Sequence, residues 1–188
     1  MPEGASLSIV GDLHGQFVDL MHIFRRHGFP SPERCYLFNG DFVDRGDCGV
    51  EISLTLFALQ QLYPRSVFLN RGNHEERSVH SVYGFMQECT AKYDKDMYDA
   101  FSRVFAQLPI ATVVNEKVLV LHGGVDELMT MEKLMAAPRA QYVVHASPVI
   151  ASDCPLMAVD WLPHQVRRQR DQLREPGQKG ENMGTDGH

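Results

Sequence analysis

Four short apolar runs in this chain each end in a cluster of glycine and polar residues. The runs span residues 7–10, 35–38, 66–69 and 118–121. The clusters that follow them are Asp12-Leu13-His14, Gly40-Asp41, Gly72-Asn73-His74 and His122-Gly123-Gly124. Short apolar runs bounded by turn residues predict buried strands. Because ligands of open α/β sheets bind outside the carboxyl ends of the strands, we expect the four clusters to meet in one site.

Helical patterns fill the segments between the runs. Residues 17–27 place their apolar side chains on one helical face and stop at Gly28, and residues 50–62 are apolar on most sides. Residues 79–108 also have a helical pattern, with a break near Tyr93-Asp94, and 111–121 has the pattern of a hairpin. Alternation of strands and helices predicts an α/β fold with parallel pairing.

The side chains in the four clusters are of the types that bind metal ions. Carboxylate, imidazole and amide oxygen ligands favour Mn2+, Fe or Zn2+. One aspartate with two oxygens can bridge two cations about 3.5–4 Å apart, and a neighbouring glycine lets the backbone approach such a crowded site. Each cluster alone is more typical of a turn or a surface ion pair, but four of them at successive strand ends predict a metal centre.

Charge and cysteine content narrow the class of partner. The 188 residues include 18 basic and 24 acidic side chains, a net charge of -6, so no basic excess indicates nucleic-acid binding. No apolar stretch reaches the roughly 18 residues of a membrane span. The four cysteines form no close pair, which favours reduced thiols. We therefore expect no nucleic-acid or membrane partner and a cytoplasmic protein, with the nucleus as a second compartment.

The motifs GDLHGQ, GDFVDRG, RGNHE and LHGG, in this order, resemble the phosphoprotein phosphatase family of serine/threonine phosphatases. The stretches CYLFNGDFVDRG, LTLFALQQLYP, FLNRGNHEERSVHSVYGF and LPIATVVNEKVLVLHGG are most similar to its EF-hand-containing branch, and next to protein phosphatase 5. This resemblance covers residues from about 7 to 125. It implies the calcineurin-like metallophosphatase fold, an α/β architecture with a β-sandwich flanked by helices. Residues 1–164 would be a catalytic domain incomplete at its C-terminal end, and 165–188 a polar, disordered tail.

The resemblance also implies a set of metal ligands. Asp12 and His14 would hold one cation, Asn73 and His122 a second, and Asp41 would bridge the two. Mn2+ is the expected cation in vitro, with Fe or Zn2+ as alternatives. A hydroxide shared by the two cations would attack the phosphorus of a phosphoserine or phosphothreonine.

Three further residues would carry out the catalytic steps. Arg45 would bind the phosphate oxygens, since its planar guanidinium can make two contacts at once. His74 would protonate the departing serine or threonine oxygen, and Asp44 would orient that imidazole. The expected partners are phosphoprotein substrates and regulatory proteins.

Some features of the family are not found in this sequence. A further histidine ligand, a second phosphate-binding arginine and a calcium loop are absent, so we expect weak turnover from the chain as given. His145 and His164 are candidate replacements for the histidine, although each is more typical of a loop or surface. The remaining histidines are expected on helix surfaces, in loops or at the terminus, and these are His22, His27, His80 and His188.

Two other functions stay open from the sequence. A dinucleoside tetraphosphatase of the same superfamily would share the GDxHG and GNHE elements. The Tyr83-Gly84-Phe85 stretch and Lys92-Tyr93 favour the protein phosphatase. A non-catalytic fragment that binds metals or partners is the second alternative.

Overall fold

A computed structural model describes residues 4–125 and 129–141 of the chain. Its elements, in order, are β1 (Ser6–Val10), α1 (Phe17–His27), β2 (Arg34–Phe38), α2 (Gly49–Leu62), β3 (Val67–Leu69), the 3-10 helix η1 (Asn73–Glu75), α3 (Arg77–His80), α4 (Phe85–Lys92), α5 (Lys95–Phe105), β4 (Ala111–Val114), β5 (Val118–Leu121), α6 (Met131–Ala136) and the 3-10 helix η2 (Arg139–Gln141). The predicted strands and helices are confirmed, as is the break at Tyr93-Asp94 between α4 and α5, but residues 81–84 interrupt the predicted 79–108 segment a second time, between α3 and α4. Within the described residues, no helix has the length and apolar character that crossing a membrane requires.

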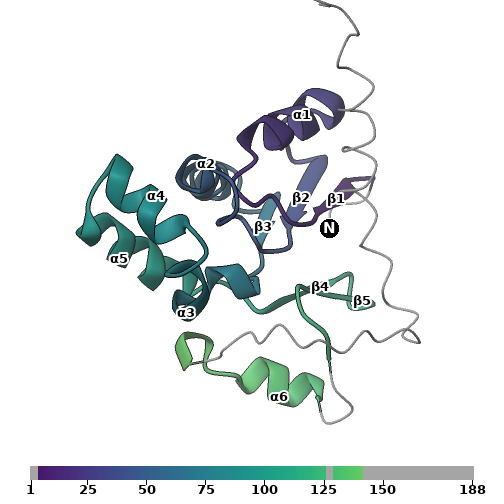
Figure 1. Cartoon of the computed structure of the whole chain (residues 1–188). Helices are drawn as coiled ribbons and strands as arrows, with labels where there is room; N and C mark the ends of the chain where they lie inside the picture. The colour runs from purple at the N-terminus through teal and green to yellow at the C-terminus, as the bar shows by residue number, and fades with distance from the viewer. Residues whose placement is uncertain (1–3, 126–128, 142–188) are drawn as a thin grey trace, which may run out of the picture.

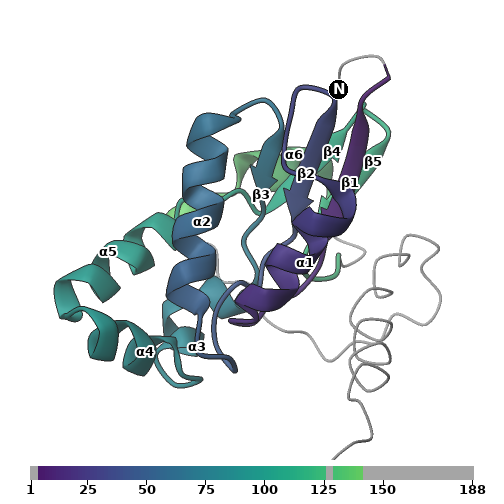
Figure 2. The ribbon, with the colours of Figure 1, turned by 90° about the horizontal axis from the view of Figure 1, so that it is seen from above.

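The described strands form two sheets. In the first, β1, β2 and β3 pair in parallel in that order, with Leu7 opposite Cys35 and Tyr36 opposite Val67. In the second, β4 and β5 form the predicted antiparallel hairpin. Helices α1 and α2 lie on one face of the parallel sheet and the hairpin lies on the other (Figures 1 and 2). This two-sheet arrangement with outer helices is the predicted α/β fold.

Two asparagine side chains connect the sheets at the ends of β2 and β3. The Asn70 amide donates to Asn39 Oδ1 at 2.8 Å and to the Val120 carbonyl at 3.0 Å. The Asn39 amide donates to the Leu121 carbonyl at 3.1 Å. Because backbone groups at a buried sheet junction need partners, these contacts fix β5 beside β2 and β3. They bring His122, the next residue along the chain, to the carboxyl ends of the parallel strands.

His80 is buried, so the prediction of a surface or loop position for this residue is wrong. It lies on the four-residue helix α3 and is 0% exposed. The rings of Phe85, Tyr98 and Phe105 surround it at centroid distances of 5.7, 5.2 and 5.7 Å. Packing of α3 against α4 and α5, which depends on the tertiary fold, covers this imidazole.

This burial predicts a pH-dependent stability. Burial lowers the pKa of His80 to about 4 from an ordinary 6.5, so below pH 6.5 the unfolded chain binds a proton that the folded chain does not. Stability from this group is therefore present above pH 6.5 and is lost as the pH falls toward 4. Between pH 8 and pH 5 the loss should be about 2 kcal/mol of unfolding free energy.

Urea unfolding of the wild type and of His80→Phe at both pH values measures this contribution. The variant keeps an aromatic ring but has no titrating group, so its stability should fall by about 2 kcal/mol less than that of the wild type. All other histidines are common to the two proteins. An equal fall in both would show that His80 does not titrate in this way.

Candidate active site

The turns that follow β1 and β2 are joined through the backbone of Asp41. The N–H groups of Leu13 and His14 both donate to the Asp41 carbonyl at 2.9 Å. His14 and Asp41 have left-handed backbone conformations, with φ of 40° and 55°. A non-glycine residue in this region is strained and is kept there only by its surroundings. The strain turns both side chains toward the same point beyond the strand ends.

Glu75 connects the turn after β2 to the turn after β3. Its carboxylate accepts hydrogen bonds from the N–H groups of Asp41, Phe42 and Gly72, each at 2.8 Å, and the residue is 1% exposed. Burial and the Asp41 charge raise the pKa of Glu75 to about 7, whereas the three N–H donors favour its ionised form. The sequence motifs assign Glu75 no role. The only local sequence signal for Glu75 is its position three residues after Gly72, which is the position of the glutamate in a helix capping box.

Glycine lets these turns approach one another closely. A Cβ atom on Gly40, whose φ is 86°, would lie 2.5 Å from Gly72 Cα, and one on Gly72 would lie 2.5 Å from Asp41 N. Both distances are well inside van der Waals contact. Larger residues at Gly40 or Gly72 would therefore separate the turns that carry Asp41 and Asn73.

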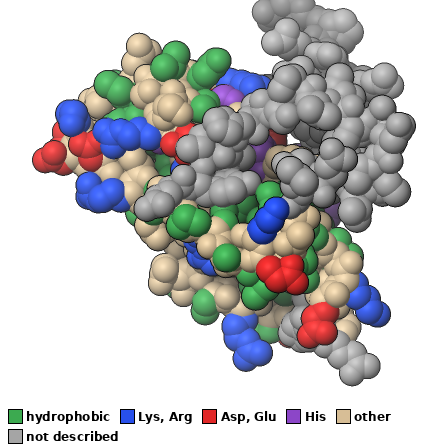
Figure 3. All heavy atoms as spheres, turned by 90° about the horizontal axis from the view of Figure 1, so that it is seen from below, with side chains coloured by type: hydrophobic (Ala, Val, Ile, Leu, Met, Phe, Trp, Pro, Cys, Tyr) green, Lys and Arg blue, Asp and Glu red, His purple; other side chains and the backbone are tan. Residues whose placement is uncertain are grey.

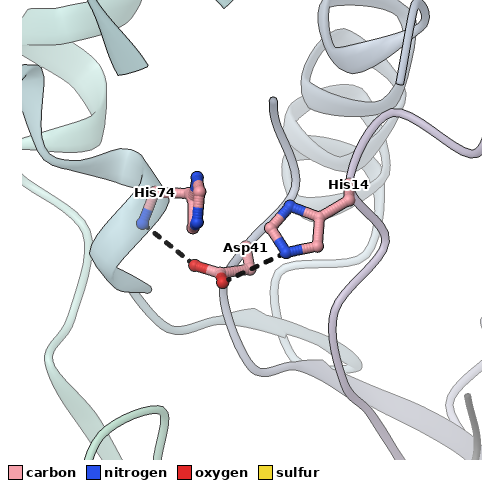
Figure 4. A group of neighbouring side chains, drawn as sticks. All are labelled: His14, Asp41 and His74. Carbon is pink, nitrogen blue, oxygen red and sulfur yellow. Dashed lines mark hydrogen bonds and ion pairs between the residues drawn. The ribbon is translucent and has the colours of Figure 1, made fainter. Parts of the chain in front are cut away.

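The rings of His14 and His122 are oriented in the same way. His14 Nδ1 lies 2.8 Å from the Val43 carbonyl and His122 Nδ1 lies 2.7 Å from the Asn39 carbonyl. A carbonyl only accepts, so Nδ1 carries the proton and Nε2 faces Asp41 in both residues. His14 Nε2 is 3.4 Å from Asp41 Oδ2, an interaction drawn as a dashed line in Figure 4, and His122 Nε2 is 3.3 Å from Asp41 Oδ1.

The donor set fits a pair of divalent cations. His14 Nε2 is buried and has no hydrogen-bond partner among the described residues, as expected of an atom that binds a metal. Asp12 Oδ2 lies 3.7 Å from His14 Nε2, and Asn73 Oδ1 lies 3.0 Å from His122 Nε2. The structure thus brings all five predicted ligands together around Asp41. Their division between two cations stays a prediction.

The two ligand imidazoles differ in their electrostatics. Burial lowers the pKa of His14 below its ordinary value, which keeps the ring neutral and able to coordinate. Burial acts in the same direction on His122, but the hydrogen bond and charge of Asp41 raise its pKa to about 9. A cation bound at His122 would therefore replace a proton.

His74 is held differently, by a carboxylate. Its Nδ1 donates to Asp44 Oδ2 at 2.7 Å, and its Nε2 faces Arg45 Nη2 at 3.3 Å. Asp44 is fully buried and also accepts from the Phe85 N–H at 2.9 Å. Burial disfavours the charged ring, but the Asp44 hydrogen bond and the charges of Asp41 and Asp44 raise the pKa of His74. The predicted trio of Asp44, Arg45 and His74 is therefore assembled beside the predicted metal ligands.

Two predicted replacements cannot be placed in this site. His145 and His164, named as substitutes for a further ligand, lie outside the described residues, as does the expected tail at 165–188.

The backbone strain at Asp41, Asp44 and Arg45 has no signal in the sequence, because left-handed conformations usually coincide with glycine.

Comparison with known proteins identifies the family of the chain. The family model for calcineurin-like phosphoesterases matches residues 6–179. The chain is 54% identical over 122 residues to serine/threonine-protein phosphatase T of Aspergillus oryzae, covering 65% of this chain and 26% of that protein. It is 49% identical over 140 residues to human serine/threonine-protein phosphatase with EF-hands 2, covering 73% and 19%. It is 41% identical over 169 residues to human serine/threonine-protein phosphatase 5, covering 89% and 33%. The chain thus spans a third or less of these relatives, and both predicted branches are among them.

Solved structures share the fold. A serine/threonine phosphatase from Saccharomyces cerevisiae, described as similar to human phosphatase PP5, superposes with a TM-score of 0.71 at 39% identity, over 79% of this chain and 46% of that one. A putative diadenosine tetraphosphatase superposes with a TM-score of 0.53 at 19% identity, over 70% and 56%. At that identity the second likeness establishes the fold alone.

Asp41 should be needed for both cations. Asp41→Asn removes the negative charge between His14 and His122, so Mn2+ affinity should fall at both sites. The fall should exceed the roughly 10–100-fold that is usual when a residue that only hydrogen-bonds to a metal ligand is changed. His14→Ala should weaken one site much more than the other. Isothermal titration of the chain with Mn2+ measures both effects, and the exposed Asp96→Asn is the matched control. Two unchanged sites in Asp41→Asn would contradict the bridging role.

Glu75 should act on metal binding from outside the ligand set. Glu75→Gln replaces one acceptor oxygen with an amide group that faces backbone N–H donors, so the turn carrying Asp41 should shift. We expect Mn2+ affinity to fall about 10–100-fold and unfolding free energy to fall by about 1–3 kcal/mol. The exposed Glu132→Gln serves as control. Unchanged Mn2+ affinity in a destabilised Glu75→Gln would limit Glu75 to a structural role.

Proposed function

The chain belongs to the calcineurin-like phosphoesterase family, and we propose that it is a metal-dependent phosphatase acting on phosphoserine and phosphothreonine in proteins. The observation that carries this proposal is the position of the Asp41 carboxylate, 3.4 Å from His14 Nε2 and 3.3 Å from His122 Nε2. A carboxylate between two imidazoles with oriented Nε2 atoms is suited to a pair of cations. Mn2+ is the proposed cation in vitro, with Fe or Zn2+ as alternatives.

The proposed metal ligands place the reaction at the strand ends. Two divalent cations, held by Asp12, His14, Asp41, Asn73 and His122, would supply positive charge for the phosphate and ionise a water near neutral pH. Arg45 would bind and orient the phosphate oxygens from its position beside His74.

His74 would deliver a proton to the departing side-chain oxygen. Its Nδ1–H is fixed on Asp44, so Nε2 is the nitrogen that exchanges a proton with the substrate. Because Asp44 and Asp41 raise the pKa of His74, the ring binds a proton more readily than an ordinary histidine at neutral pH. A protonated group is what an alkoxide leaving group requires. Asp44 would keep the ring in this tautomer.

The same observations favour this function over the two alternatives. A fragment that only bound metals would not need His74, Asp44 and Arg45 assembled next to the ligands. The likeness to a putative diadenosine tetraphosphatase, at 19% identity, extends to the fold alone. Acidic and basic side chains are interspersed over the α4–α5 end of the face in Figure 3, so this end shows no continuous basic patch for a polyanion. Hydrolysis of a phosphothreonine peptide, compared with diadenosine tetraphosphate, tests the choice of substrate.

His74→Asn should separate binding from chemistry. Mn2+ content should stay nearly constant, because both ring nitrogens of His74 face Asp44 and Arg45. Turnover of a phosphothreonine peptide should fall roughly 10²–10⁴-fold, the usual contribution of a general acid. The loss should be smaller for p-nitrophenyl phosphate, whose leaving group needs little protonation. His22→Asn on α1 is the control. Equal losses on both substrates would assign His74 another role.

A further inference from the structure

The segment that carries Asp44 and Arg45 is strained at two successive residues. Their φ angles are 67° and 65°, both left-handed and both in non-glycine residues. Such a conformation persists only where neighbouring contacts hold the chain. Within the described residues, these contacts come from His74 on η1, from Tyr83 in the turn before α4 and from Phe85 at the start of α4.

Helix α4 holds this segment on both sides of Arg45. On the N-terminal side, the Phe85 N–H donates to Asp44 Oδ1 at 2.9 Å. On the C-terminal side, Lys92 Nζ donates to the Asp47 carbonyl at 2.5 Å. Arg45 therefore lies between two residues, Asp44 and Asp47, that are both attached to the same helix.

Glu88 makes the third attachment, at the start of α2. Its two carboxylate oxygens accept from the N–H groups of Gly49 at 3.1 Å and Val50 at 2.8 Å. The residue at the N-cap of α2, Cys48, makes no side-chain capping bond, so a side chain from another helix satisfies these donors. A carboxylate is favoured there by the helix dipole.

Lys92 balances the charge of Glu88. Its Nζ lies 2.9 Å from Glu88 Oε1 and 2.7 Å from Glu51 Oε2, and the Glu88 side chain is only 8% exposed. A carboxylate this well covered keeps its charge more easily beside a cation and two N–H donors. Glu88 and Lys92 thus form one unit attached to the 44–50 segment.

We propose that Glu88 and Lys92 are positioning residues that keep Arg45 in place to bind phosphate, an inference that rests on the proposed function. Neither side chain takes part in the predicted metal site. They act through the backbone at Asp47, Gly49 and Val50, whose position determines where the strained turn places the Arg45 guanidinium.

A double-mutant cycle tests this role through phosphate binding. The probe is inorganic phosphate, titrated by calorimetry into the Mn2+-loaded chain. Glu88→Gln should weaken binding about tenfold in the wild-type background but less than about twofold in the Arg45→Ala background, since residues acting through one contact are not additive. Lys92→Met should behave in the same way. Equal losses in both backgrounds would overturn the proposal.

Hydrogen exchange provides a second readout that does not depend on phosphate or turnover. In Glu88→Gln, amide exchange should increase at Gly49 and Val50 and also at residues 45–47. Faster exchange confined to Gly49 and Val50 would limit Glu88 to capping α2 and would overturn the proposal. The control is Lys95→Met, because Lys95 is also the lysine of an i,i+4 pair but bonds Asp99 on α5, at 3.0 Å.

The outcomes separate this inference from the proposed function. If the wild type binds phosphate through Arg45 but hydrolyses no phosphothreonine peptide, the proposed function fails while the cycle still tests Glu88. If the peptide is hydrolysed and the cycle is additive, the proposed function stands and the role of Glu88 fails. If Glu88→Gln does not fold, Lys92→Met takes its place in the cycle, because the Lys92 side chain is 30% exposed.

Discussion

Three backbone N–H groups from two different turns donate to one buried carboxylate, that of Glu75. Without this acceptor, the donors of Asp41, Phe42 and Gly72 would be buried and unsatisfied, which is costly. The carboxylate in turn is tolerated in the interior because it is fully hydrogen bonded. This mutual dependence places Asp41 between His14 and His122, and the rest of the site is arranged around Asp41. The second turn, which carries Asn73 and His74, is fixed by the same contact.

The second constraint is the junction of the two sheets. Asn39 and Asn70 follow β2 and β3 and donate to carbonyls of β5. A side-chain amide can donate to a backbone carbonyl that strand pairing does not reach. The two asparagines therefore let the hairpin lie against the carboxyl end of the parallel sheet. His122 then reaches Asp41 from the opposite sheet. The site therefore requires both sheets, although Asp12, His14 and Asp41 come from the parallel sheet alone.

What the sequence predicted well is local. Strands and helices follow from apolar runs and helical patterns, each of which lies within a short stretch of sequence. The residues that the family resemblance implies as metal ligands lie directly after the strands, and their role as ligands stays a prediction. The contacts that were missed join distant residues. Glu88 and Lys92 have the spacing of an ordinary i,i+4 surface pair, yet Glu88 bonds Gly49, 39 positions earlier. His80 looked like a helix-surface residue because α3 is too short to show which face is buried. Strain at Asp44 and Arg45 was hidden for a related reason, since the contacts that hold these residues come from His74, Tyr83 and Phe85, which are distant in the sequence.

Four histidines show how the fold assigns different chemistry to the same side chain. His14 and His122 have Nδ1 on a carbonyl, a neutral acceptor that orients the ring and leaves Nε2 facing Asp41. His74 has Nδ1 on the carboxylate of Asp44, whose charge favours a protonated ring. His80 has neither kind of partner among the described residues and is surrounded by aromatic rings, which lowers its pKa to about 4. The acceptor opposite Nδ1 thus fixes the orientation of each of these three rings and leaves Nε2 as the nitrogen that faces the site. That acceptor is supplied by the turn after β2, through Asn39, Val43 and Asp44, so one short segment determines the roles of three histidines carried by three other parts of the chain.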